Sequence, residues 1–331
     1  MKKSFKILAI LLFFTILFTS VKVKASSNQF VYLGGDSIGI KMNTGVYVVG
    51  KYQVQSGNGK VSPWEKSNIE VGDCIESVNG IKITNNTQLQ KYIKDTNTST
   101  LKLKINRNGV SISTQVEVVE NNSKEKTIGL YIRDQILGIG TLTFITQNYK
   151  FASLGHGIYD NNILIHAESG NIYTSHVQTI KKSEPGVAGE KRASLDNKVI
   201  GKISLNDVTG LYGTFNQVDK KRTLIEIANQ DEVKNGPAKI YTVVDNDKIE
   251  AFDVEIIDVK RQKEDAVKGI KIKVTDTKLI SKTGGIVQGM SGSPIVQDGK
   301  IVGAVSHVTL ENPVYGYGMH INFMNDKTNQ F

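Results

Sequence analysis

Cysteine and proline are scarce in this chain of 331 residues, which has one cysteine and 5 prolines. The lone thiol, Cys74, cannot close an internal disulfide and has no companion for a metal cluster. Low proline argues against a proline-rich disordered chain, and the hydrophobic content of 39% is ordinary for a globular protein. The 31 glycines, together with many Val, Ile and Thr residues, favour short strands joined by tight turns.

The sequence also lacks a dense basic stripe with interleaved aromatic residues, although its net charge is +9. Residues 1–25 contain five lysines and no acid, and removing them from +9 leaves +4 for the rest of the chain. Such a small, dispersed surplus does not predict a nucleic-acid partner. It is compatible with a position near an anionic membrane surface.

Long apolar runs are absent apart from residues 7–21, ILAILLFFTILFTSV, which follow a lysine-bearing N-terminus. A basic start, an apolar stretch and small residues after it are typical of a secretory signal, with a cleavage site after Ala25. An uncleaved membrane anchor is the alternative, although the run is short for a full span. Residues 1–25 are therefore expected to be a signal peptide or N-terminal membrane anchor, and the remaining chain to be exported.

Residues 30–120 read as a small PDZ-like α/β domain. The string IEVGDCIESVNG at 69–80 is similar to the core of PDZ domains, and Asn79-Gly80 is a hairpin-turn signal. A helix is expected over 85–95 and strands on either side of the turn at Asn108-Gly109. Such domains bind a peptide, or a chain's own terminus, as an added strand. The glycine-rich stretch that would hold its end is expected at Leu33, Gly34, Gly35, Ile38 and Gly39. A spacer domain that binds no peptide is the alternative.

Residues 121–127 are polar and charged and are expected to form a linker. Beyond them, residues 128–331 contain many short apolar runs separated by Gly, Asn, Asp and Lys, and no long amphipathic helix. This pattern predicts a mostly β domain, either a barrel or a sandwich.

The most informative string of this second domain is GGIVQGMSGSPIV at 284–296. A serine between glycines, followed by Ser-Pro and an apolar run, resembles the nucleophile loop of chymotrypsin-like peptidases. Glycines permit a tight turn that exposes the Ser291 hydroxyl. The same turn can direct the N–H groups of Gly289 and Ser291 toward one point as an oxyanion hole. By itself the motif is moderate evidence, because short Gly/Ser strings also occur in ordinary loops.

A nucleophilic serine needs a base, and the chain offers five histidines. His156 lies among small residues in ASLGHG, which leave its imidazole room to approach a serine. The other four, His166, His176, His307 and His320, are more often structural in such settings. The orienting acid remains open from spacing alone, with Asp160, Asp253, Asp258 and Asp276 as candidates.

Taken together, the motifs resemble the stage IV sporulation protein B (SpoIVB) serine peptidase family. The resemblance rests on GGDSIGIK at 34–41, GLYIRD at 129–134, GIGTLTF at 138–144, LGHGIYD around His156, VTDTKLI at 274–280, GGIVQGMSGSP at 284–294, GAVSHV at 303–308 and YGYGMHI at 315–321. It extends over nearly the whole chain and implies a β-barrel-like, chymotrypsin-like peptidase domain over 128–331.

The resemblance implies a His156, Asp276, Ser291 triad without metal or organic cofactor. It also implies a sporulation role: an exported, membrane-associated endopeptidase in the space between forespore and mother cell. Such an enzyme would cleave a membrane-associated regulatory protein, thereby signal between the two compartments, and cleave itself. A non-catalytic PDZ scaffold, or a related peptidase with another substrate, is the alternative.

Overall fold

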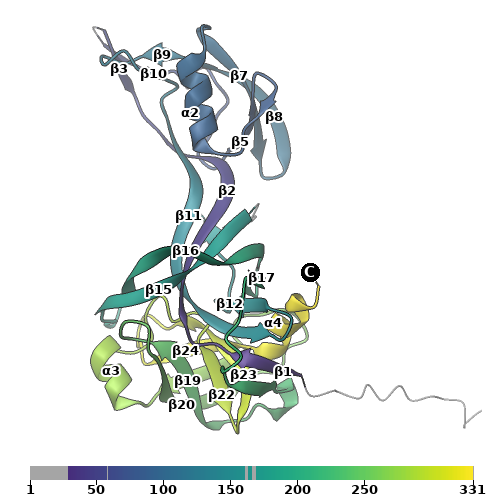
Figure 1. The fold of residues 1–331 in the computed structure, drawn as a ribbon. Helices are drawn as coiled ribbons and strands as arrows, with labels where there is room; N and C mark the ends of the chain where they lie inside the picture. The colour runs from purple at the N-terminus through teal and green to yellow at the C-terminus, as the bar shows by residue number, and fades with distance from the viewer. Residues whose placement is uncertain (1–28, 58, 161–162, 166–168, 331) are drawn as a thin grey trace, which may run out of the picture.

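The computed structural model describes residues 29–57, 59–160, 163–165 and 169–330. Residues 1–25, in which the signal peptide or anchor was expected, lie outside the described residues, as does His166. Within the described residues, no helix is long and apolar enough to cross a membrane. The fold is mostly β, as the sequence predicted, with a small domain above a larger one in Figure 1.

A closed ring of strands forms the first barrel of the larger domain, with each strand antiparallel to its neighbours. In ring order its strands are β2 (Ser37–Lys51), β15 (Ser169–Lys181), β16 (Glu190–Asp207), β17 (Gly210–Phe215), β12 (Lys150–Ser153) and β11 (Leu130–Thr146). Ile38, Ile40 and Leu142 are among the residues that fill its core. A short hairpin, β13 (Tyr159–Asp160) and β14 (Ile163–Leu164), extends from it.

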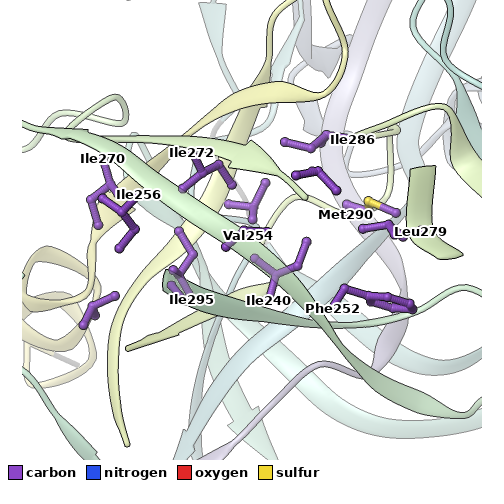
Figure 2. Packing of buried hydrophobic residues seen from close by; sticks show 14 of the residues in the cluster. Ile240, Phe252, Val254, Ile256, Ile270, Ile272, Leu279, Ile286, Met290 and Ile295 are labelled. Carbon is purple, nitrogen blue, oxygen red and sulfur yellow. The ribbon is translucent and has the colours of Figure 1, made fainter. Parts of the chain in front are cut away.

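A second barrel closes in the same way. Its strands in ring order are β19 (Gly236–Val243), β20 (Ile249–Val259), β21 (Ile270–Val274), β24 (Tyr315–His320), β23 (Lys300–Val308) and β22 (Pro294–Gln297). Alternation along β20 explains why it is a barrel strand: Phe252, Val254 and Ile256 point inward and are buried. Figure 2 shows these side chains packed against residues of β19, β21 and β22.

Further elements join and cover the two barrels. Strand β1 (Phe30–Leu33) pairs with β11 and with β18 (Leu224–Ile227), and β18 in turn pairs with β23 of the second barrel. The short helix η1 (Gln230–Glu232) and helix α3 (Thr277–Thr283) belong to the second half of the chain. Helix α4 (Ile321–Thr328) buries Ile321 and Met324 in a cluster shared with β1 and β18. This cluster fixes one barrel against the other.

The smaller domain has the PDZ-like arrangement that the sequence predicted. Its elements are β3 (Val54–Ser56), β4 (Gly59–Val61), β5 (Cys74–Val78), β6 (Ile81–Lys82), α2 (Asn86–Asp95), β7 (Thr100–Arg107), β8 (Val110–Glu117), β9 (Val119–Glu120) and β10 (Lys126–Thr127). The buried Asp73 carboxylate accepts two hydrogen bonds from Arg107, at 2.7 and 2.9 Å, and one from the Glu70 N–H. This explains the Gly-Asp pair of the signature, because a buried carboxylate must be paired.

Two long strands are shared by the two domains. Strands β2 and β11 pair with each other from Lys51 and Leu130 in the PDZ-like domain to Ser37 and Thr141 in the first barrel. They form the ribbon that joins the domains in Figure 1. Residues 121–127, expected as the linker, instead lead through the turn of the β9–β10 hairpin. The chain therefore passes between the domains within β2 and β11.

Candidate active site

The loop that carries Ser291 is a tight turn before β22. Gly289 and Gly292 both have φ of +92°, a conformation that residues with a Cβ rarely adopt. The N–H of Met290 donates to Val287 O at 3.1 Å, and the N–H of Ser293 donates to Met290 O at 2.9 Å. These bonds leave the N–H groups of Gly289 and Ser291 without an acceptor in the described part of the chain.

Strand β11 of the first barrel holds this loop in place. The Thr141 N–H donates to Ser291 O at 2.9 Å, and the Thr141 hydroxyl donates to Gly289 O at 2.7 Å. The Thr143 hydroxyl donates to Gly292 O at 2.8 Å. The Ser291 loop of the second barrel is therefore fixed by side chains and backbone of the first, a contact that short-range sequence patterns do not reveal.

His156 reaches the same place from the first barrel. Leu154 and Gly155 have φ of 72° and 65°, so the chain turns sharply after β12. A Cβ on Gly292 would lie 2.4 Å from the Leu154 nitrogen, and one on Gly155 would lie 3.0 Å from Val305 O. The turn before His156 and the Ser291 loop are thus in direct backbone contact, and only glycine permits this approach.

The hydrogen bonds of His156 indicate which of its nitrogens can act as a base. Its Nδ1 lies 2.7 Å from Gly157 O, so Nδ1 carries the proton and donates to that carbonyl. This assignment leaves the Nε2 lone pair available. Burial lowers the pKa of His156, and the Gly157 hydrogen bond opposes this effect. The imidazole is therefore neutral at pH 7, as a general base must be.

The lowered pKa of His156 predicts how catalysis depends on pH. A group whose folded-state pKa is lowered stays neutral until the pH falls through that lower value. We expect kcat/KM to decline on the acidic side with a midpoint below 6.5, the value of an unperturbed histidine. The measurement is kcat/KM against pH, with circular dichroism at each pH as the control for unfolding. A midpoint above 6.5 in folded protein would contradict the assignment.

A second histidine, His307 on β23, lies beside His156. The ring centroids are 5.3 Å apart, and the buried Nδ1 of His307 has no hydrogen-bond partner in the described residues. Burial, and then His156 itself, lower the pKa of His307 to about 4. The preceding residue, Ser306, accepts a hydrogen bond from the Ser291 hydroxyl at 3.3 Å. Sequence reasoning treated His307 as structural, because its strand-like surroundings gave no signal of this proximity.

The structure brings the Ser291 loop into contact with the turn before His156 but does not bring Asp276 to either. Asp276 is the N-cap of α3: its Oδ1 accepts from the Leu279 N–H at 2.8 Å, and its Oδ2 from the Asp253 N–H at 3.4 Å. Among the described residues, no hydrogen bond or ion pair joins His156 to any carboxylate. The assignment of Asp276 as the orienting acid therefore stays a prediction.

Replacing Asp276 by Asn distinguishes a role as helix cap from a role as the orienting acid of the triad. Asn is as good an N-cap as Asp, whereas loss of a triad carboxylate costs roughly 10⁴ in turnover. If the carboxylate only caps α3, Asp276→Asn keeps turnover within about threefold, and in either case Asp276→Ala should lose about 1 kcal/mol of stability as a cap. Turnover and urea denaturation measure the two effects. A loss near 10⁴ in a folded Asp276→Asn protein would establish the triad acid.

The remaining histidines have other contacts. His176 Nε2 pairs with Asp196 at 3.2 Å, and His320 Nε2 donates to Lys260 O at 2.9 Å. Lys191, which sequence reasoning passed over, is buried, and its side-chain carbons lie 3.1–3.3 Å from the position that a Cβ on Gly289 would take. Burial lowers its pKa to about 7, and its Nζ bonds the Thr242 hydroxyl at 2.8 Å. In the described residues, no group of His, Cys, Asp and Glu is placed to hold a metal ion.

The residues predicted to form the PDZ ligand loop do not lie beside the helix of the PDZ-like domain. Leu33 pairs with Phe144, the N–H groups of Gly34 and Gly35 donate to carbonyls of β11, and Ile38 and Gly39 lie within β2, between β11 and β15. These residues thus belong to the first barrel and not to the edge beside α2. The prediction of a ligand loop here is wrong because the backbone N–H and C=O groups of these residues pair with strands that are distant in the sequence.

The strand beside α2 is instead β11. The Asp134 carboxylate accepts from the Asn86 N–H at 2.7 Å at the start of α2, and Lys126 Nζ bonds Thr96 O after its end. Ile128 and Leu130 are buried in one cluster with residues of α2. Gly129, with φ of 70°, precedes the strand. A glycine turn that leads into a strand beside the helix is the arrangement expected of a PDZ ligand site.

Two closed barrels, with a serine turn from one and a histidine turn from the other meeting between them, define the class of chymotrypsin-like peptidases. Two family models match the chain: SpoIVB peptidase S55 over residues 124–325 and PDZ domain over residues 31–118. The chain therefore belongs to the SpoIVB peptidase S55 family and is a peptidase with a PDZ domain. This confirms the resemblance that the sequence motifs indicated. No curated protein matches the chain significantly.

Proposed function

We propose that this peptidase is a serine endopeptidase with Ser291 as its nucleophile and His156 as its general base. The observation that carries the proposal is the backbone contact between the Ser291 loop and the turn before His156, made at Gly292 and Leu154. Each residue comes from a different barrel and lies in a glycine turn. Thr141 and Thr143 of the first barrel hold the Ser291 turn, and the turn before His156 packs against Val305 of the second barrel. Rigid placement of this kind is what nucleophilic catalysis requires.

In the proposed reaction the Ser291 hydroxyl leaves the Ser306 carbonyl and donates to Nε2 of His156. His156 accepts the proton as Oγ attacks the peptide carbonyl, and later gives it to the leaving amine. The Gly157 carbonyl holds the imidazole in the required tautomer. The N–H groups of Gly289 and Ser291 stabilise the oxyanion, since no described carbonyl occupies them.

A fluorophosphonate probe tests this proposal directly. Such probes react with a serine only when it is activated, so purified protein should be labelled at Ser291, as located by mass spectrometry. Labelling should be lost in His156→Ala. A folded protein that resists labelling would overturn the proposal.

The alternative is a non-catalytic PDZ scaffold, and one observation favours it. The Ser291 hydroxyl bonds the Ser306 carbonyl and makes no hydrogen bond to His156 within the described residues. Catalytic hydrogen bonds are often long or misaligned without substrate, so this geometry alone does not decide. Absence of labelling together with retained peptide binding would establish the scaffold.

The biological role proposed here follows from the family. We infer that the enzyme is exported in endospore formation, acts at a membrane surface between forespore and mother cell, cleaves a membrane-associated regulatory protein and processes itself. The family name and the basic, apolar N-terminal sequence support this inference. Mass spectrometry of exported wild-type and Ser291→Ala protein tests leader removal and self-cleavage together.

The register of β2 and β11 defines how the PDZ domain can be removed. Deletion of residues 30–120 would remove β2, a strand of the first barrel, and β1, which pairs with β11 and β18. Met42 and Ile136 are register partners whose backbone groups face each other, so replacing residues 43–135 by Asn-Gly leaves the barrel strands joined by a hairpin turn. We expect this variant to cleave labelled casein within about threefold of wild type. It should process the full-length Ser291→Ala chain at least tenfold more slowly, because tethering raises effective concentration. Equal rates on both substrates would argue for a spacer.

A further inference from the structure

A cationic side chain, Lys268, lies close to the site that contains Ser291 and His156. The loop that carries it joins β20 to β21 and is closed at its base, where the Lys260 N–H donates to Gly269 O at 2.8 Å. Lys268 directly precedes this closing residue, so its backbone is held in place, and the residue is exposed to solvent.

Ser306 provides a first connection between this loop and the nucleophile. Its carbonyl accepts a hydrogen bond from the Ser291 hydroxyl at 3.3 Å. Its own hydroxyl bonds the carbonyl of Val267, the residue before Lys268. The loop is therefore fixed to the same residue that contacts the Ser291 hydroxyl.

His307 provides a second connection, which leads to the proposed base. Its ring centroid lies 5.3 Å from that of His156, and its register partner on β24 is Tyr317. The Lys268 ammonium lies 5.5 Å from the centre of the Tyr317 ring, a cation–π contact. After burial and His156, the charge of Lys268 is the third cause that lowers the pKa of His307. The side chains of His156, His307 and Lys268 thus follow one another outward from the site.

No acidic side chain of the described residues forms an ion pair with Lys268. Asp265, in the same loop, pairs instead with Lys327 at 3.4 Å. No carboxylate is among the groups that shift the pKa of His307, the histidine beside Lys268. The positive charge next to the site is therefore not neutralised by the part of the chain that the structure describes.

The next lysines along the chain, Lys271 and Lys273 on β21, are in a different position. Their register partners on β20 are Asp258 and Glu255, so each lysine has an acidic residue on the neighbouring strand. Cross-strand pairs of opposite charge stabilise a sheet, which accounts for these two lysines without a ligand. Lys268 has no such partner.

We propose that Lys268 makes the enzyme select substrates with an aspartate or glutamate within two residues of the scissile bond. The inference rests on the proposed peptidase function and specifies its substrate class. Because the scissile carbonyl has to lie between Ser291 and His156, only side chains close to it in the substrate can pass His307 and reach Lys268. A substrate carboxylate there supplies the anion that the ammonium lacks, and an unbalanced charge beside a site attracts groups of opposite sign.

A peptide library of random sequence tests this selectivity without a known substrate. Wild-type enzyme digests the library, and mass spectrometry identifies the residues around each cleaved bond. We expect Asp and Glu to be enriched at one position within two residues of that bond. Two peptides that differ only by Glu or Gln at this position then give the ratio of their kcat/KM values. The expected ratio is about tenfold in favour of Glu, the size of a charge interaction over several Å near a protein surface.

Charge variants of the loop assign the selectivity to Lys268. Lys268→Glu should bring the Glu-to-Gln ratio below one, and Lys268→Gln, which removes the charge without adding another, should bring it to about one. The matched control is Lys263→Glu, an equal change of charge at an exposed position of the same loop, which should keep the wild-type ratio. Added salt should reduce the ratio in wild type and leave it unchanged in Lys268→Gln, because exposed charges are screened. Circular dichroism checks that each variant is folded.

The possible results separate this inference from the proposed function. A wild-type enzyme that is labelled at Ser291 by the fluorophosphonate probe, yet cleaves the library without enrichment of Asp or Glu, would overturn the inference alone. So would a preference for Glu that folded Lys268→Gln retains, or one that Lys263→Glu loses equally. Failure of the wild type to label is a different result, which overturns the proposed function itself.

Discussion

Ser291→Ala should abolish peptide-bond hydrolysis, with turnover falling by about 10⁶ while the protein remains folded. The hydroxyl makes a single long hydrogen bond, 3.3 Å to Ser306 O, so its removal costs little stability. Turnover on casein and thermal unfolding of wild type and variant measure the two effects. Self-cleavage should disappear together with casein cleavage.

Ser293 supplies the matched control for this experiment. It lies two residues further on, is fully buried, and its hydroxyl has no hydrogen-bond partner among the described residues. Ser293→Ala removes the same atom from the same loop and should leave turnover within a few-fold. Equal losses in both variants would mean that the loop is fragile or that the wrong serine is assigned, and retained cleavage by folded Ser291→Ala would end the assignment.

Gly292→Ala should remove most activity by a different route, through the geometry of the loop. A Cβ at this position would lie 2.1 Å from Thr141 O and 2.4 Å from the Leu154 nitrogen, so two backbone segments would have to move. These segments hold the Ser291 loop and lead into His156. A displacement of about 1 Å in a catalytic site can cost 10²-fold in rate. We expect a loss of at least this size in kcat/KM, together with a lowered midpoint in urea.

Gly299→Ala isolates the cost of backbone conformation from the cost of the clash. Gly299 also has positive φ, +75°, but a Cβ there would meet nothing within 4 Å. This variant should lose about 1–2 kcal/mol of stability and keep its activity. If Gly292→Ala behaves like Gly299→Ala in both measurements, the close contact between the two loops is not what positions the nucleophile.

Local features of the active site and of the PDZ domain could be predicted from the sequence because adjacent residues create them. The positive φ of Gly289 and Gly292 follows the Gly-x-Ser-Gly pattern, and Asn79-Gly80 forms the expected turn with φ of 49° and 82°. His156 was chosen from five histidines by its small neighbours, and Gly155 lets the turn before it pack closely against Val305. Each of these predictions depended on a few consecutive residues.

Other features depend on contacts between residues that are far apart in the sequence. Residues 33–39 carry a glycine pattern that suits a ligand loop, yet their backbone pairs with strands more than a hundred residues away. Asp276 ends an alternating run, and the structure shows that its carboxylate caps the helix that starts there, so its role as orienting acid stays a prediction. His307 was passed over because nothing nearby in the sequence indicates that β23 carries it to His156.

The sequence by itself determined that the chain is mostly β, that a PDZ-like signature precedes a serine loop, and that Ser291 and His156 are the residues to examine. Hydrophobic periodicity and the conformational freedom of glycine act over a few consecutive residues, so both can be recognised in the sequence alone. Only the tertiary structure decided that β2 and β11 serve both domains and that Thr141 and Thr143 hold the Ser291 loop. Barrel closure sets these contacts, because strand register is chosen by all neighbouring strands together.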